Sequence, residues 1–364
     1  MLALLNIPSP SGYTDQIVHH VCSQLKAMEL HHEVTRRGAI RATIPAEPKS
    51  PQDRAICVHL DTLGGMVTQI KSNGRLAITP VGTWSSRFAE GARVTIYTSK
   101  EQYRGSVMPL KASGHVFGPE VDTQPVDWDN VEIRVDTDGT LKQDMLEKGF
   151  DVGDFVAFDA NPEIVPNGYI NSRHLDNKAG AAILLAVAKS ITDNKIALPV
   201  DCHLLFTIFE EIGIGATEVL YSDINELIVI DCAMVSEKQN SSEHSVTIAM
   251  MDQAGPFDYH LNRKLSALCL ENRINFRKDV FKFYRSDSAS AIESGSDVRT
   301  ALVGFGIDGS HGYERTHMDS LRETAKLIFA YMLSTPTFAR DEHDIGSING
   351  FPHQPVRELI KIET

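Results

Sequence analysis

Carboxylate and imidazole side chains recur in five separate segments of the chain, most of them at the end of a short apolar run. They are His59 and Asp61 in CVHLDTLGG, Asp176 in NSRHLDNKAG, Glu210 and Glu211 in FTIFEEIG, Asp231 in IVIDCA, and His311, Glu314 and His317 in GSHGYERTH. Each segment alone has an ordinary explanation, such as a helix N-cap or a turn residue. Five of them together favour one shared site. Carboxylates gathered in a cleft must be neutralised, and a pair of divalent metal ions does this.

The number of these residues fits such a pair of ions. Two metals about 3.5–4 Å apart need one bridging carboxylate. One histidine and one further carboxylate for each metal then leave a position open for water. Glu210 and Glu211 are adjacent, so one of them can hold metal while its neighbour does acid–base work.

The apolar runs predict the strands of a largely parallel sheet. They cover residues 55–60, 203–209, 227–232, 246–251 and 300–305, and helical patterns lie at 13–30, 178–191, 259–272 and 321–334. Strands that alternate with helices indicate an α/β domain with three layers and helices on both faces of the sheet. Ligands collect at the carboxyl ends of the strands in such sheets. The polar residues that follow the strands are therefore expected to meet there.

Residues 66–165 have a different pattern. Their short β-like segments are separated by Gly, Pro and Asp and show little helical periodicity, which is typical of a small β-barrel or sandwich. We predict a catalytic domain over 1–65 and 166–340, an inserted β-rich domain over 66–165 and a C-terminal extension over 341–364.

Composition narrows the class of protein. The net charge of −13 argues against nucleic acid, whose phosphates need a basic surface. No stretch approaches 18 consecutive apolar residues, so no membrane span is expected. The five cysteines form no C-x-x-C pair, which argues against a zinc ribbon or a disulfide framework. The start, MLALLNIPSPSG, lacks the basic segment of a secretory signal, and a cytoplasmic protein is expected.

The order His-x-Asp, Asp before a helix, Glu-Glu, Asp, His resembles the dinuclear zinc exopeptidase superfamily. The long β-rich insertion between Asp61 and Asp176 is similar to that of the tetrahedral aminopeptidases (family 42 of metallopeptidases), which include glutamyl aminopeptidases. The segments IPSPSG, VGDFVAFDA, GYINSRHLDNKAG, SDSASAIESG and TALVGFGIDGSHGYE add to the resemblance, which covers most of residues 6–335.

The resemblance implies a role for each metal ligand. His59 and Asp231 would bind one metal, Glu211 and His311 the other, and Asp176 would bridge the two. His317 is the alternative to His311 as the last ligand.

The resemblance also implies the acid–base residues. Glu210 would be the general base that activates the water between the metals and then protonates the leaving amine. Asp61 would hold the His59 imidazole, and Glu314 would contact a ligand or the substrate amine. A cis peptide bond is expected between Asp176 and Asn177.

The function that follows is a metal-dependent aminopeptidase that removes N-terminal residues from short peptides. Zinc or cobalt is expected, with manganese also compatible with nitrogen and oxygen ligands. Members of the family form dimers through the inserted domain and then hollow dodecamers, so a homo-oligomer is expected. The chain departs from the family pattern at Thr62, Asn177 and Lys178, and in the segment FGIDGSHGYERTH. These differences put its substrate preference in question.

Two alternatives remain open. The segments HLDT and SHGYERTH suggest a hydrolase of N-acylated amino acids or of a specialised acylated dipeptide. The bridging Asp of such deacylases lies much nearer the first His than it does here. A binding module without catalysis is disfavoured, because every ligand and the base are present.

Overall fold

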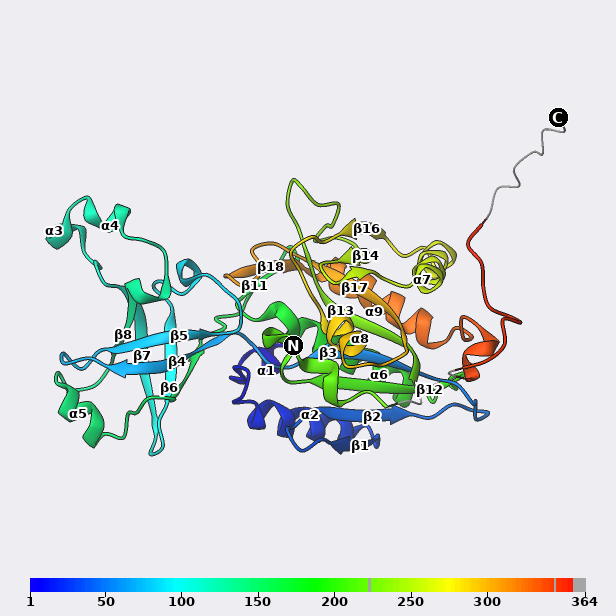
Figure 1. The fold of residues 1–364 in the computed structure, drawn as a ribbon, viewed down its shortest axis with the longest axis horizontal. Coiled ribbons are helices and arrows are strands. Elements are labelled where there is room, and N and C mark those ends of the chain that lie inside the picture. The colour runs from blue at the N-terminus through cyan, green and yellow to red at the C-terminus, as the bar shows by residue number, and fades with distance from the viewer. Residues whose placement is uncertain (222–223, 344, 356–364) are drawn as a thin grey trace.

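The computed structural model describes residues 1–221, 224–343 and 345–355. They form an α/β body and a closed β-barrel, each built around its own hydrophobic core. Figure 1 shows the barrel projecting from one end of the body. This arrangement confirms the predicted fold class.

One mixed sheet runs through the body in the order β1-β2-β12-β3-β13-β17-β14-β15, with β16 beside β14. Its strands are β1 (His31–Val34), β2 (Ile40–Ile44), β3 (Asp53–His59), β12 (Asp201–Thr207), β13 (Ile224–Met234), β14 (Val246–Asp252), β15 (Gly255–Pro256), β16 (Phe276–Val280) and β17 (Arg299–Ile307). β12, β3, β13 and β17 are mutually parallel, whereas β2 and β14 run antiparallel to their central neighbours. Central parallel strands are covered on both faces, which explains their almost continuous apolar runs.

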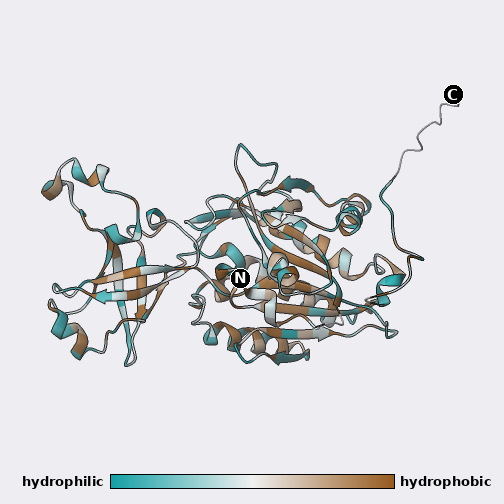
Figure 2. Cartoon of the chain, viewed as in Figure 1, coloured by the Kyte–Doolittle hydropathy of each residue, from teal (hydrophilic) through white to brown (hydrophobic). Residues whose placement is uncertain are grey.

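Helices cover this sheet. They are α1 (Leu2–Leu5), α2 (Asp15–Ala27), α6 (Leu175–Asp193), α7 (Tyr259–Glu271), α8 (Asp287–Glu293) and α9 (Met318–Met332). α9 packs against both α6 and α7, and these three contact the central strands. α2 contacts β1 and β2, and its buried residues Ile17, Val21 and Leu25 recur every four positions. Figure 2 shows the apolar residues concentrated along the strands and on parts of the helices that cover them.

The barrel closes in the order β4-β5-β8-β7-β6-β9, with every pairing antiparallel. Its strands are β4 (Gly64–Ile70), β5 (Leu76–Val81), β6 (Arg93–Tyr97), β7 (Gln102–Pro109), β8 (Val131–Val135) and β9 (Phe155–Phe158). The short helices α3 (Gly114–Phe117), α4 (Glu120–Thr123) and α5 (Lys142–Glu147) lie in its connections. Closure leaves no unpaired strand edge, so the alternating apolar residues of β4–β9 can form an independent core.

A third, smaller sheet links β10 (Glu163–Ile164), β11 (Tyr169–Ser172) and β18 (Glu314–His317). The predicted C-terminal extension lies partly outside the described residues. Its first residue, Asp341, is fixed to the body by Arg299, whose Nε lies 2.6 Å from an Asp341 oxygen. Among the described residues, no helix combines the length and the apolar character that a bilayer crossing needs.

Candidate active site

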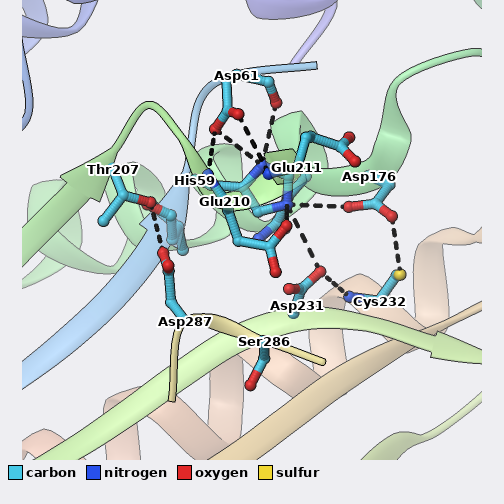
Figure 3. A network of polar contacts seen from close by, with 12 residues as sticks. His59, Asp61, Asp176, Thr207, Glu210, Glu211, Asp231, Cys232, Ser286 and Asp287 are labelled. Carbon is cyan, nitrogen blue, oxygen red and sulfur yellow. Dashed lines mark hydrogen bonds and ion pairs between the residues drawn. The ribbon is translucent and has the colours of Figure 1, made fainter. Parts of the chain in front are cut away.

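The site residues come from neighbouring strand ends. His59 is the last residue of β3, and Asp231 lies in the adjacent strand β13. β12 flanks β3 on the other side and leads into the 3-10 helix η3 (Glu210–Ile212), which contains the glutamate pair. Asp176 lies in the first turn of α6. Because the carboxyl ends of parallel strands share one edge of the sheet, these side chains converge there (Figure 3).

The Asp176 carboxylate lies between two histidines. Its Oδ1 atom is 3.1 Å from His59 Nε2, and its Oδ2 atom is 3.6 Å from His311 Nε2. Asp231 Oδ1 lies 3.8 Å from the same His59 nitrogen, and Glu211 Oε2 lies 3.7 Å from the His311 nitrogen. The structure thus forms two groups, each with one histidine and one carboxylate, which share Asp176.

Both histidines present the same nitrogen to Asp176. His59 Nδ1 lies 3.0 Å from the backbone oxygen of Asp61, and His311 Nδ1 lies 3.0 Å from the backbone oxygen of Thr83. A carbonyl can only accept, so Nδ1 carries the proton in both rings and donates it. Nε2 is therefore the atom of each ring that can bind a metal.

Glu210 and Glu211 occupy different positions in the site. The Glu210 Oε2 atom lies 3.7 Å from His59 Nε2, and its side chain is 13% exposed. Glu211 is deeper, with 4% of its side chain exposed. Glu210 is therefore the member of the pair with more access to solvent.

Asp61 fixes the glutamate pair as well as the histidine. Its carboxylate accepts hydrogen bonds from the backbone N–H of Glu210 (3.1 Å) and of Glu211 (3.2 Å), and from the Ser11 hydroxyl (2.5 Å). The carboxylate lies 3.6 Å from His59 Nδ1, which bonds instead to the Asp61 carbonyl. One buried residue therefore sets the positions of a histidine and of two carboxylates.

Glu314 supports the opposite side of the centre. Its buried carboxylate accepts the backbone N–H of Asp176 (3.1 Å) and that of His311 (3.0 Å). The other histidine considered, His317, is turned elsewhere. Its Nε2 lies 2.8 Å from the Asn167 carbonyl, and its Nδ1 accepts the Asp319 N–H at the start of α9.

Two positions that depart from the family pattern are structural anchors. The peptide bond between Asp176 and Asn177 is cis, and the Asn177 side chain donates to the Ile230 carbonyl at 2.7 Å. Lys178 is buried and donates to the Ile7 carbonyl. Neither residue lines the cavity beside the site.

Two residues near the candidate metal centre had no role predicted from the sequence. Cys232 Sγ lies 3.1 Å from Asp176 Oδ2. Asp287 accepts hydrogen bonds from the Thr207 hydroxyl (2.5 Å) and the Ala216 N–H (2.8 Å). Asp287 belongs to the segment SDSASAIESG, which contributed only to the family resemblance. An acidic residue at a helix start was the available signal, but such residues are usually caps.

Burial and mutual repulsion dominate the electrostatics. Burial, followed by neighbouring carboxylates, raises the pKa of Glu211 and of Asp231 above their ordinary values, and raises that of Glu314 to about 8. Burial alone would lower the pKa of His311, but Asp176 and Glu211 raise it to about 10. Burial would also raise the pKa of Asp176, but the two histidines lower it. The centre thus holds an excess of acidic groups over histidines.

These residues fit divalent metal ions. Ligand atoms of His59, Glu210 and Asp231 lie within 4.8 Å of one another, and so do those of His59, Asp176 and Glu211. Asp231 Oδ2 is buried and has no hydrogen-bond partner among the described residues. A buried charged oxygen without a partner is costly unless a cation neutralises it. Imidazole and carboxylate ligands suit zinc and related divalent ions.

A cavity of about 660 Å³ opens beside His311 and Ser310. Aromatic side chains from both parts of the molecule form much of its wall: Trp84 and Phe88 from the barrel, and Phe281, Phe283 and Tyr284 from the body. Lys238 and Lys282 also line it. The cavity is large enough for one or two amino-acid residues and lies directly against His311, one of the candidate metal ligands.

Replacing Glu314 with glutamine is expected to weaken metal binding by about 10- to 100-fold, because residues that orient metal ligands have effects of this size. The amide nitrogen of glutamine cannot accept one of the two backbone N–H groups. Calorimetric titration of metal-free protein with cobalt measures the change. Glu271→Gln, at an exposed position at the end of α7, is the control. Equal affinity in both variants would contradict the positioning role.

A family model and a curated protein match most of this chain. The family model described as M42 glutamyl aminopeptidase matches residues 38–327. YhfE of Bacillus subtilis (strain 168), which carries a provisional name as an aminopeptidase, is 37% identical over 332 residues, covering 91% of this chain and 95% of that protein.

Solved structures share the fold. The TET aminopeptidase from the marine sediment archaeon Thaumarchaeota archaeon SCGC AB-539-E09 superposes with a TM-score of 0.83 at 16% identity, over 93% of this chain and 97% of that one. The TET1 peptidase of Pyrococcus horikoshii gives a TM-score of 0.80 at 23% identity, over 92% and 98%. The latter can assemble into a tetrahedron or a large octahedral shell.

Proposed function

The chain belongs to the M42 glutamyl aminopeptidase family, as its motifs predicted, and we propose that it uses two divalent metal ions to remove the N-terminal residue of short peptides. One observation carries this proposal. The Asp176 carboxylate lies between the Nε2 atoms of His59 and His311, and each histidine has a further carboxylate nearby. A shared carboxylate between two such groups is the arrangement that a metal pair requires.

The ligand roles follow from these positions. His59 and Asp231 would hold one ion, and Glu211 and His311 the other, with Asp176 in contact with both. Bound divalent ions would supply Lewis acidity, which polarises the scissile carbonyl and makes water a better nucleophile near neutral pH. Zinc and cobalt fit the nitrogen and oxygen ligands best, and manganese is a third candidate.

Glu210 would move the proton. Its carboxylate faces the centre near His59 and is more exposed than that of Glu211. Burial raises the pKa of Glu210 above its ordinary value, which makes it a stronger base for the proton of the attacking water. The same carboxyl group would then protonate the leaving amine as the C–N bond breaks. Asp61 keeps this carboxylate in place through the Glu210 N–H.

The charge of the centre favours substrates with a free N-terminus. Four carboxylates, those of Asp176, Glu210, Glu211 and Asp231, gather around the two histidines, and their charge would attract a substrate ammonium group. The cavity reaches this centre at His311. The cavity itself is mainly aromatic but contains Lys238 and Lys282. We propose that it accepts side chains with an apolar stem and a polar or anionic end.

Removing the metal should abolish activity, and adding it back should restore it. The test uses a panel of aminoacyl 4-nitroanilides and short peptides, each with a free and an N-acetylated N-terminus. The protein is treated with a chelator and then titrated with zinc, cobalt or manganese. Activity that returns at two equivalents per chain, for free N-termini only, is expected. Cleavage of the acetylated set alone would favour the N-acyl or acylated-dipeptide hydrolase instead.

Membership of the family also suggests how this chain assembles and where in the cell it is located. We propose a homo-oligomer built from dimers, up to a dodecamer, with the barrel as the dimerisation surface. Val116, Leu141 and Val152 of the barrel region are largely exposed, as an association surface requires. All five cysteines are unpaired, which fits the reducing cytoplasm.

A further inference from the structure

Tyr284 carries a hydroxyl group that is buried beside the candidate active site and has no hydrogen-bond partner among the described residues. Its side chain lines the cavity together with Ser310 and His311. A buried polar group without a partner reduces stability, so a phenylalanine would be the better residue for packing alone. A functional role would explain the presence of this hydroxyl.

The position of this side chain is well defined. The Tyr284 carbonyl accepts the Gln253 N–H at 2.9 Å, and its ring packs edge-on against Phe281 with centroids 5.6 Å apart. Three residues later, Asp287 is bonded to Thr207 at the end of β12. The segment is thus tied to the strand that leads into the glutamate pair.

The surroundings of the hydroxyl are acidic. Burial and then the charges of Asp231, Cys232, Asp176 and Glu210 raise the pKa of Tyr284 well above its ordinary value. The phenol therefore keeps its proton and can donate it in a hydrogen bond to a negatively charged partner. Among the described residues no group accepts a hydrogen bond from this hydroxyl, so its donor is not used within the protein.

The reaction creates one atom that needs such a donor. When water adds to the scissile carbonyl, the C=O π electrons move to the carbonyl oxygen, and Glu210 takes the proton of the water. When the C–N bond breaks, the C=O bond forms again and the proton passes to the leaving nitrogen. The oxygen carries its negative charge only between these two steps, and a donor placed there lowers the barrier of both.

We propose that Tyr284 is a catalytic residue that donates a hydrogen bond to the scissile carbonyl oxygen as it becomes negatively charged. This inference rests on the proposed function, since it assigns a role in amide hydrolysis at the same site. It also explains why this wall of the cavity contains a tyrosine whose hydroxyl has no hydrogen-bond partner among the described residues.

The test compares Tyr284→Phe with wild type on the 4-nitroanilide that wild type cleaves fastest. The variant keeps the ring and loses only the donor. We expect kcat to fall by about 100-fold, as for the loss of one oxyanion donor, with KM within about threefold. Metal content and the melting temperature should not fall. Tyr103→Phe is the control, because its hydroxyl bonds to Glu101 in the barrel.

Binding gives a readout that does not depend on turnover. An aminoalkylboronic acid becomes tetrahedral and anionic in the site, whereas the free product amino acid does not. Calorimetry should show about 10- to 100-fold weaker binding of the boronic acid to Tyr284→Phe and unchanged binding of the product. Equal binding of the boronic acid to both proteins, or an equal loss for both ligands, would overturn the proposal.

These results distinguish the role of Tyr284 from the proposed aminopeptidase activity. An active wild type with an equally active Tyr284→Phe variant overturns the role of Tyr284 and leaves the aminopeptidase intact. A wild type that cleaves nothing in the panel overturns both.

Discussion

Replacing Glu210 with glutamine is expected to lower kcat by about 10²- to 10⁴-fold while the metal content stays at the wild-type level. Glutamine has the same shape and keeps the backbone N–H that Asp61 accepts. It cannot take a proton from water at neutral pH. Steady-state kinetics and elemental analysis of the purified protein measure the two quantities.

The neighbouring residue is the matched control for this substitution. Glu211→Gln makes the same chemical change one position later, next to His311. It should lower metal content, and excess metal should restore part of its activity. If Glu210→Gln instead lost metal and recovered with excess metal, Glu210 would be a ligand and another group would be the base.

Replacing Asp176 with asparagine is expected to reduce bound metal from two ions to at most one per chain and to lower activity by about 10³-fold or more. The two oxygens of Asp176 lie 3.1 Å from His59 Nε2 and 3.6 Å from His311 Nε2, so its loss affects both groups. A metal contributes several kcal/mol of transition-state stabilisation, and about 4 kcal/mol corresponds to 10³-fold in rate.

Cobalt titration followed by calorimetry measures the stoichiometry directly. Asp193→Asn, in the last turn of the same helix, is the control, because its carboxylate is exposed and pairs with Lys189 on the surface of the helix. An Asp176→Asn variant that bound two ions with wild-type affinity would rule out a shared ligand at this position.

The strand-end residues could be predicted because parallel strands share one carboxyl edge. His59 and Asp231 follow from apolar runs that end in polar residues, and the structure has them on adjacent strands.

Other features depend on tertiary contacts that no local pattern contains. Glu314 supports Asp176 only because β18 pairs with β11 in a separate small sheet. Tyr284 and Asp287 lie at the end of an irregular segment and the start of a short helix, where neither helical nor strand periodicity applies. Asn177 is a further case, because its side chain donates a hydrogen bond to the backbone of β13, which lies far from it in the sequence.

The contact between His311 and the Thr83 carbonyl makes the barrel a working component of the catalytic centre. Thr83 lies just after β5, and Trp84 and Phe88 of the same connection form part of the cavity wall. The active site is therefore a composite of two modules, and neither contains all of it. We therefore expect that changes within the barrel can alter the cavity and the position of His311 while the proposed metal ligands stay the same. Exchanging barrels between relatives would then change substrate selectivity together with the proposed association surface.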